Sequence, residues 1–356
     1  MRYISAATGS CIAETDVASV VQRVGRRWEG LRAARLFITG GTGFVGSWLL
    51  ASLCCANRQL GLDVRIVLLT RDPAAFARSA PALADDDAVH LVGGDVREFS
   101  WPGGRFSHVI HGAAAADAAL AEACPGEVES TIIDGTRRVA DFCEANGVDR
   151  FLALGSGAVY RQPAVAGRLL SENDPLGWDI LEDERYIYHY AKRRMESVLG
   201  ACGDRQGPAA TIARLFAFVG PGLPLDRHFA IGNFIADALA GGPVVVHGDG
   251  KPVRSYLYAA DMAVWLWAIL LDGRPGRAYN VGSERAVTIA EAARIVADAV
   301  TPSADVRIEG SHTAGGGGSW YVPDTRRVRA ELGVVERTAL GDAVRRTISS
   351  HREGIR

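Results

Sequence analysis

Short apolar runs alternate with amphipathic segments along the first two thirds of this chain. Six runs are typical of buried strands: Leu36–Thr39, Val64–Thr70, Val89–Val92, His108–His111, Arg150–Leu154 and Ala210–Leu215. Three segments between them carry apolar residues at helical spacing: Val45–Asn57, Thr131–Asn146 and Asp183–Gly200. Continuous apolar strands separated by helices are the pattern of a parallel sheet covered on both faces. The chain is therefore predicted to be an α/β protein with a doubly wound parallel sheet.

This regular alternation ends near residue 216. Beyond the loop at 221–224 we expect shorter elements at Ile231–Ala240, Val244–His247, Asp261–Leu271 and Ile289–Val300. At the other end, Asp16–Leu31 has helical spacing and precedes the first strand. We divide the chain into a helical N-terminal extension at 1–34, a sheet domain at 35–215, and a smaller lobe at 216–356 that is interleaved with the sheet. The glycine run within 313–318 is expected to be a flexible loop.

Composition argues against several classes of protein. The formal net charge of −2 gives no reason to expect nucleic acid or an anionic membrane as a partner. The longest apolar run, Met262–Leu271, is about half of the roughly 20 residues that a membrane helix needs, so a buried helix explains it better. No secretory signal is expected, because the N-terminus lacks a basic segment followed by an apolar one. Six cysteines without metal-ligand spacing indicate reduced thiols and no metal site, as in a cytoplasmic protein.

The most specific motif is a turn with three glycines at three-residue spacing, directly after the run Leu36–Thr39. Gly40 would let the chain turn sharply, Gly43 would let the backbone approach a pyrophosphate, and Gly46 would let the next helix pack closely on the sheet. The free N–H groups at the start of that helix favour an anion. This turn predicts a dinucleotide site of the Rossmann type. The expected cofactor contacts are Gly40, Thr42, Gly43, Phe44, Val45 and Gly46.

The GxxGxxG spacing of this turn, with Thr39 before it and Phe44 and Val45 within it, resembles the short-chain dehydrogenase/reductase superfamily. The chain is similar to the extended branch of nucleotide-sugar epimerases and dehydratases from about residue 35 to residue 333. The resemblance implies a Rossmann-type sheet with a smaller substrate lobe and a nucleotide-activated sugar as substrate. It also implies a homodimer formed through the helices predicted at residues 131–146 and 183–200. Their exposed faces are expected to include the apolar residues Phe142 and Met195.

A catalytic triad is predicted from Tyr188, Lys192 and Ser156. Tyr188 and Lys192 are four residues apart, which places them on one face of a helix. A phenol with a pKa near 10 is a poor base at neutral pH, and a neighbouring ammonium favours the phenolate. The resemblance also assigns Lys192 to the nicotinamide ribose, and Ser156 to a hydrogen bond with the reacting oxygen. The gap from Ser156 to Tyr188 is longer than usual, so an insertion around 168–183 is expected at the rim of the site.

Two departures from the family pattern bear on the reaction. The 4,6-dehydratases of the family carry Asp-Glu directly after the Ser or Thr, and its decarboxylases also use a Glu there, whereas this chain has Gly157 and Ala158. Neither residue can transfer a proton. The chain is therefore predicted to be an NAD(P)-dependent nucleotide-sugar epimerase that transiently oxidises a sugar hydroxyl, at C4. The alternatives are an NADPH-dependent nucleotide-4-keto-sugar reductase and a dehydratase that takes its acid from elsewhere.

The choice between NAD and NADP depends on the end of the second strand. Arg71 would pair with a 2′-phosphate or stack on adenine, which favours NADP. Asp72 would accept from the ribose hydroxyls of NAD, or would only cap the helix after Pro73. The resemblance implies further cofactor contacts at Asp95, Val96, His111, Ala113 and Ala114. Gly112 stands where the family usually has Leu.

Candidate substrate residues lie in the second half of the chain. The segment 248–258 resembles the one whose Arg clamps the diphosphate, so Arg254 is expected to bind phosphate oxygens through its guanidinium fork. Further candidates are Phe216 and Asn233, followed by Asn280 and Arg326. Ala217 stands where the family commonly has an Asn that binds the nucleotide sugar. His189 and His228 have no assigned role.

Two alternatives share the fold but not the reaction. A cofactor-binding regulatory protein without catalysis would usually lack Tyr188 or Lys192, and this chain has both. A steroid or flavonoid reductase would have an apolar substrate site and would tolerate the loss of Arg254.

Overall fold

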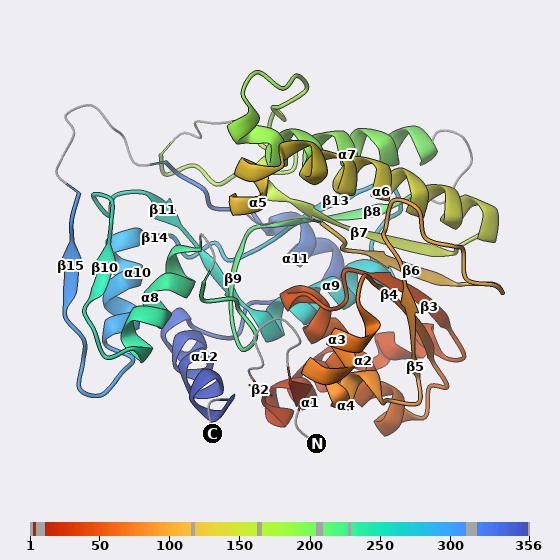
Figure 1. Cartoon of the computed structure of the whole chain (residues 1–356), viewed down its shortest axis with the longest axis horizontal. Coiled ribbons are helices and arrows are strands. Elements are labelled where there is room, and N and C mark those ends of the chain that lie inside the picture. The colour runs from red at the N-terminus through yellow and green to blue at the C-terminus, as the bar shows by residue number, and fades with distance from the viewer. Residues whose placement is uncertain are drawn as a thin grey trace.

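A seven-stranded parallel sheet forms the centre of the molecule (Figure 1). The computed structural model describes residues 3–4, 11–114, 118–161, 166–203, 209–226, 229–310 and 319–354, with only the backbone described at 3–4, 118–120 and 353–354. From edge to edge the strands are β13 (Ala278–Val281), β8 (Thr211–Leu215), β7 (Arg150–Ser156), β6 (His108–His111), β3 (Arg35–Thr39), β4 (Arg65–Thr70) and β5 (Val89–Gly93). All neighbouring strands run parallel. The predicted doubly wound α/β fold is confirmed.

All six predicted strands belong to this sheet, and their ends differ from the prediction by one or two residues at most. Their apolar runs are continuous because helices cover both faces of the sheet. The seventh strand, β13, was not predicted. It lies beyond residue 216 and pairs with β8 at one edge of the sheet. The second half of the chain therefore returns to the sheet.

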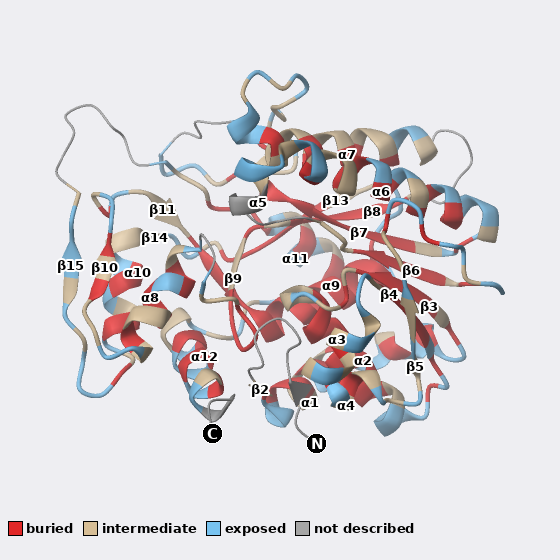
Figure 2. Cartoon of the chain, in the orientation of Figure 1, coloured by how far each residue is buried: buried red, intermediate tan, exposed pale blue. Residues whose placement is uncertain are grey.

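Helices cover both faces of the sheet (Figure 1). One face is covered by α5 (Ala118–Ala123), α6 (Pro125–Asn146) and α7 (Ile187–Gly203), and the other by α2 (Phe44–Leu60) and α9 (Ala259–Asp272). Because α9 lies between the sheet, α2 and an outer helix α1 (Glu14–Val24), nearly all of its residues are buried (Figure 2). In the described part of the chain, no helix is long and apolar enough to cross a membrane. Two short helices, α3 (Pro73–Ser79) and α4 (Pro81–Ala84), connect β4 to β5.

The segment before β3 packs on the outside of this helical layer. It contains the antiparallel strands β1 (Tyr3–Ile4) and β2 (Cys11–Ile12), helix α1 and the 3-10 helix η1 (Gly25–Leu31). Arg23 of α1 forms a buried ion pair with Asp261 of α9. Asp16 accepts a hydrogen bond from the Tyr258 hydroxyl and pairs with Arg346 near the C-terminus. These contacts tie both ends of the chain to α9 and its neighbours.

The smaller lobe lies at one end of the sheet (Figure 1, left). Its helices are α8 (Ala230–Leu239), α10 (Ile289–Ala297) and α12 (Leu340–Gly354). Its strand pairs are β9 (Ala217–Val219) with β12 (Tyr256–Tyr258), β10 (Val244–Val246) with β15 (Val306–Ile308), and β11 (Val253–Arg254) with β14 (Val287–Thr288). Helix α11 (Arg326–Leu332) instead packs on α9 and β13. The loop predicted at 313–318 lies outside the described residues.

The prediction that Phe142 and Met195 lie on an exposed apolar surface, available to a dimer, is wrong. Phe142 on α6 and Met195 on α7 are buried inside the chain's own core, between these helices and the sheet. Outward positions on α6 are charged, among them Asp134, Arg137 and Asp141. The homodimer stays a prediction, and an interface through α6 has to use this charged surface.

Candidate active site

The glycine turn lies between β3 and β6, where the strand order of the sheet reverses and where such sheets bind ligands. Gly40 has φ of 72°, and a Cβ there would lie 2.3 Å from the backbone carbon of Gly112 on the neighbouring turn. A Cβ on Gly46 would lie 2.4 Å from the Cα of Gly41, so Gly46 packs on the turn itself rather than on the sheet. Both positions require glycine.

Gly43 differs from the other two glycines because it is exposed and faces open space. A Cβ there would come no closer than 3.6 Å to another atom, the carbonyl oxygen of Gly40. Gly43 is the N-cap of the 17-residue helix α2, and no side chain caps that helix. Thr42, Phe44 and Val45 beside it are half-buried. An open glycine before an uncapped helix N-terminus fits the pyrophosphate of a dinucleotide.

His111 lies beneath the cofactor turn rather than in it. Its Nδ1 is 2.8 Å from the Thr39 hydroxyl, and its Nε2 is 3.0 Å from the Thr136 hydroxyl. Burial, with Lys192 nearby, lowers the pKa of His111 to about 3, so the imidazole is neutral. Thr39 also accepts a hydrogen bond from the backbone N–H of Ala113. His111 therefore holds the loop in place, while Ala113 and Ala114 are half-exposed above it.

The residues predicted near the adenosine have local partners. Asp72 accepts a hydrogen bond from the backbone N–H of Ala75 at 2.8 Å. It therefore caps helix α3, which is one of the two roles expected for it. The Arg97 guanidinium binds Asp95 and holds the pKa of that carboxyl below its usual value. Arg71 is exposed and close enough to Asp95 to lower that pKa further. Arg71 is the cation best placed to meet a phosphate here.

Val96, the other residue predicted at the adenine, is buried. It packs against α6 at Gly135, where a Cβ would lie 2.7 Å from the Val96 side chain. The structure therefore gives the Val96 side chain a core position beneath the site.

The three predicted catalytic residues come together from β7 and α7. Ser156 ends β7, is 7% exposed, and accepts from the backbone N–H of Ala158 at 3.1 Å. The Ser156 hydroxyl is close enough to the Tyr188 phenol to lower its pKa. The Lys192 Nζ donates to the Leu154 carbonyl at 2.8 Å and lies 5.9 Å from the centroid of the Tyr188 ring.

The environment moves the pKa values of these groups in opposite directions. Burial raises the pKa of Tyr188, and the neighbouring Ser156 hydroxyl opposes this rise. The Lys192 ammonium, which was expected to lower the pKa of Tyr188, is not among the causes of this shift. Burial lowers the pKa of Lys192 to about 8, and the Glu196 carboxylate opposes that change. Desolvation of the phenol, which the sequence did not reveal, therefore sets the direction of the pKa shift of Tyr188.

A network of buried side chains surrounds Glu196, the carboxylate that favours the charged form of Lys192. Arg214 of β8 forms a two-pronged ion pair with Glu196 of α7 at 2.9 and 2.8 Å, and both side chains are 6% exposed. Arg214 also donates to the Tyr160 hydroxyl, which donates to Asn280 at 2.6 Å. Asn280, a predicted substrate residue, is thus a structural link between β13 and the site. Sequence spacing could not show this network, because its members lie on four separate segments.

Tyr321 is the site residue that sequence reasoning missed. A Cβ added to Gly157 would lie 2.5 Å from the Tyr321 hydroxyl and 2.7 Å from the ring of Phe216. The Phe216 and Tyr321 rings pack against each other, tilted by 30°, with centroids 4.6 Å apart. Ser156 is close enough to the Tyr321 phenol to oppose the rise that burial causes in its pKa. Phe216 and Tyr321 thus occupy the space that a side chain at position 157 would need.

Arg254 reaches the same region from the smaller lobe. Its guanidinium carbon lies 5.8 Å from the centroid of the Tyr321 ring, and it donates to the carbonyls of Val253 and Ser319. Burial lowers its pKa, and no ion pair with a carboxylate is found for it among the described residues. A desolvated guanidinium without an acidic partner suits an anionic ligand. Asn233, by contrast, is exposed on α8.

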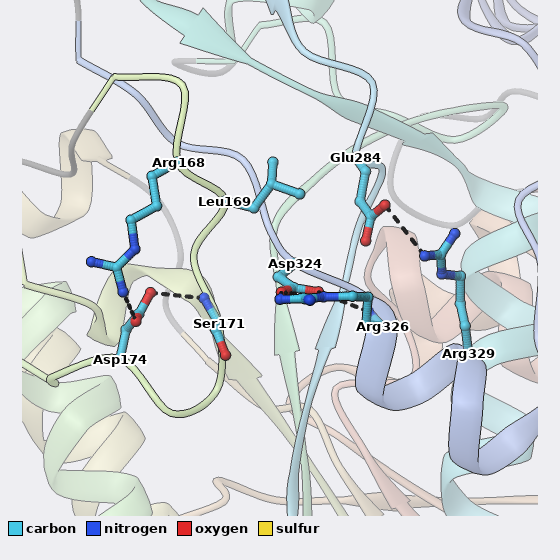
Figure 3. Close-up of a pocket in the computed structure, with 8 residues that line it drawn as sticks. All are labelled: Arg168, Leu169, Ser171, Asp174, Glu284, Asp324, Arg326 and Arg329. Atoms are coloured by element: carbon cyan, nitrogen blue, oxygen red, sulfur yellow. Dashed lines mark hydrogen bonds and ion pairs between the residues drawn. The ribbon is translucent and has the colours of Figure 1, made fainter.

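Arg326 lies in a pocket that none of the three triad residues lines. Arg326 pairs with Asp324 and lines a pocket of about 470 Å³ (Figure 3). The other residues that line the pocket are Arg168, Leu169, Ser171, Asp174, Glu284, Asp324 and Arg329. Figure 3 shows its arginines turned toward carboxylates of the same pocket. His189 packs against the ring of Trp178, and His228 lies outside the described residues.

Comparison with known proteins shows which family this arrangement represents. The model of the NAD dependent epimerase/dehydratase family matches residues 36–282, more than half of the chain. The chain belongs to this family. It is 26% identical over 329 residues to UDP-glucuronic acid decarboxylase 1 of Arabidopsis thaliana, which covers 92% of this chain and 72% of that protein. It is 24% identical over 332 residues to a dTDP-glucose 4,6-dehydratase of Streptomyces antibioticus, which covers 89% and 92%.

Solved structures of family members share the fold. An epimerase of Methanothermobacter thermautotrophicus has a TM-score of 0.78 at 21% identity, covering 93% of this chain and 96% of its own. A dTDP-glucose 4,6-dehydratase of Streptomyces venezuelae, solved with NAD bound, has a TM-score of 0.76 at 24% identity, covering 90% and 97%. The family match makes the chain an enzyme of the extended short-chain type. Solved structures of some of its relatives contain NAD.

Proposed function

We propose that this chain is an NAD(P)-dependent nucleotide-sugar epimerase that transiently oxidises the C4 hydroxyl of the sugar. The bound dinucleotide would supply the hydride acceptor and donor. Tyr188 takes the proton of the sugar hydroxyl, and Ser156 hydrogen-bonds the same oxygen. Lys192, buried behind them, directs its remaining N–H groups to the nicotinamide ribose. Arg254 keeps the diphosphate in place while the keto sugar turns over.

The observation that supports epimerisation is the space beside Ser156. Dehydratases and decarboxylases of the family need an acid there, and this chain has Gly157 and Ala158. The phenol of Tyr321 and the ring of Phe216 fill the space that a side chain at position 157 would need. A reaction that needs hydride transfer and a single proton acceptor fits this arrangement.

A dehydratase or decarboxylase is the second candidate, because such enzymes are among the relatives of this chain. A 4-ketoreductase that uses the same triad with NADPH is the third. Incubating the protein with a panel of nucleotide sugars in D2O, without added NAD(P)H, separates the candidates by mass spectrometry. We expect a product of unchanged mass and altered retention. Loss of water with uptake of deuterium would show a dehydratase, loss of carbon dioxide a decarboxylase, and turnover only of a keto sugar with NADPH a reductase.

Substitution of Arg254 tests the nucleotide-sugar part of the proposal. We expect Arg254→Ala to raise KM for the nucleotide sugar about 10- to 100-fold and to leave kcat within about threefold, because a charged hydrogen bond contributes roughly 1.5–3 kcal/mol. Steady-state kinetics over a range of substrate concentrations gives both constants. Lys251→Ala, an exposed cation three residues away, is the matched control and should change neither. An unchanged KM in Arg254→Ala would favour a substrate without a diphosphate.

Substitution of Arg71 tests the proposed preference for NADP. Arg71→Ala should weaken NADP binding about tenfold and leave NAD binding nearly unchanged, because only NADP offers a 2′-phosphate to the guanidinium. Calorimetric titration with each dinucleotide measures the two affinities. Arg78→Ala on α3 serves as the control for a general loss of positive charge. Equal losses for NAD and NADP would show that Arg71 does not select between them.

A further inference from the structure

The β12–α9 corner (residues 258–261) joins the smaller lobe to the helices that cover the sheet. Tyr258 ends β12, and α9 begins at the next residue. β12 pairs with β9, whose first residue follows Phe216. β11, which ends at Arg254, is separated from β12 by a single residue. A shift of this corner would therefore move Phe216 and Arg254 relative to Ser156.

Helix α1 binds this corner at two points. Asp16 is 5% exposed and accepts a hydrogen bond from the Tyr258 hydroxyl at 2.5 Å. Arg23 forms an ion pair with Asp261 at 2.5 Å, and these two side chains are 8% and 0% exposed. Asp16 and Arg23 are seven residues apart, about two helical turns, so they lie on the same face of α1. Together they hold the last residue of β12 and the first turn of α9.

The C-terminal part of the chain holds the same corner. Arg346 of α12 pairs with Asp16, and its guanidinium carbon lies 5.5 Å from the centroid of the Tyr258 ring. The Asp261 carboxylate accepts hydrogen bonds from the backbone N–H groups at positions 337 and 338, at 3.1 and 3.0 Å. Asp16 is therefore the residue at which α1, β12 and α12 meet.

We propose that Asp16 is a positioning residue that holds the β12–α9 corner in place and so fixes the distance between Arg254 and the catalytic triad. Asp16 lies outside residues 36–282, the part of the chain that matches the family model. A ligand that is bound by Arg254 and reacts beside Ser156 and Tyr188 has to span the gap between the smaller lobe and the sheet.

A corner that is free to shift lets this gap vary. The ligand then has to order the corner when it binds, and this cost lowers its affinity. The chemical step depends on groups at the end of β7 and at the start of α7, which Asp16 does not touch. The inference rests on the proposed function only in taking Arg254 as the residue that binds the diphosphate.

Hydrogen exchange followed by mass spectrometry tests the role of Asp16 in the protein without substrate. We expect Asp16→Ala to speed amide exchange at residues 217–219 and 253–258 about tenfold, the fold-change for loss of one charged hydrogen bond, while β3, β4, β6 and β7 keep their rates. Glu29→Ala, which removes an exposed acid of η1 that pairs with Arg32, is the matched control and should leave all rates unchanged. Unchanged exchange at both segments in Asp16→Ala would overturn the proposal, as would an equal increase throughout the sheet.

Calorimetric titration with UDP and with dTDP measures the consequence for the ligand. We expect Asp16→Ala to weaken binding of the nucleotide that the wild-type protein prefers about three- to tenfold, and to leave the affinity for NAD unchanged. In the Arg254→Ala background, Asp16→Ala should weaken nucleotide binding no further. A loss that persists in this background would overturn the proposal. Lower stability with unchanged nucleotide affinity would also overturn it, because it would show a merely structural role.

Tyr258→Phe keeps the test valid if Asp16→Ala does not fold. It removes the same hydrogen bond and leaves the ion pair between Asp16 and Arg346 in place. It should speed exchange at the same two segments. If the wild-type protein binds neither UDP nor dTDP, the nucleotide-sugar part of the proposed function fails, and the exchange experiment still decides this inference.

Discussion

Tyr188→Phe is expected to lower kcat by about 10³-fold while the protein stays folded and binds its cofactor. Removing the phenolic oxygen removes the group that we propose takes the sugar proton. General acid–base groups contribute about 10²–10⁴-fold. Phenylalanine keeps the buried ring of Tyr188 and removes only its hydroxyl, so the effect falls on the chemical step. Single-turnover kinetics with a substrate identified by the panel measures it.

Tyr186→Phe is the matched control for this substitution. Tyr186 lies on the 3-10 helix η3 (Glu184–Tyr186), is 40% exposed, and packs on Trp178 rather than on Ser156. It should retain full activity. A Tyr188→Phe enzyme with more than about a tenth of the wild-type kcat would show that another group takes the proton, and the cofactor-binding protein without catalysis would then need to be considered again.

Trp28→Ala is expected to lower the free energy of unfolding by about 3–5 kcal/mol, as large-to-small changes in a core do. Trp28 is 0% exposed, and its ring lies 5.0 Å from the ring of Trp267 on α9. Its Nε1 donates to the Val21 carbonyl at 3.0 Å, so the indole joins η1 to α1 as well. Truncation leaves a cavity between the N-terminal segment and the helix that lies against the sheet. Urea unfolding followed by circular dichroism measures the change.

Trp101→Ala is the control for removal of an indole. Trp101 is 40% exposed and contacts Phe142 only edge to face, so its truncation should cost roughly 1 kcal/mol. Equal costs for the two variants would mean that the N-terminal segment adds no more to stability than a surface side chain. In the folded fraction, Trp28→Ala should keep its kcat, because Trp28 touches none of the catalytic residues.

Features of the site that lie within one element were predictable from the sequence. Tyr188 and Lys192 share a helix face because four residues make about one turn. The glycine turn was recognisable because Gly40 needs a positive φ and Gly46 meets the backbone of Gly41, constraints that act over six residues. Ser156 was predicted from the resemblance of residues 151–160 to the family's strand-end segment.

Positions that depend on contacts between distant segments were predicted incorrectly or not at all. Phe142 and Met195 look like surface residues of their helices, and only the packing of α6 and α7 on the sheet buries them. The pKa of Tyr188 is raised rather than lowered, because burial by its neighbours outweighs the effect of the Ser156 hydroxyl.

The sequence alone thus predicted six of the seven strands of the sheet, the glycine turn and the Tyr188–Lys192 pair, because each of these is encoded by spacing within a few residues. The tertiary structure alone decided what stands beside the triad. Tyr321 is 165 positions from Ser156 along the chain (321 minus 156), and the pairing of residues 319–321 with β11 brings the two hydroxyls together. Such a contact has no periodicity to reveal it, because it depends on how the smaller lobe folds back over the end of the sheet.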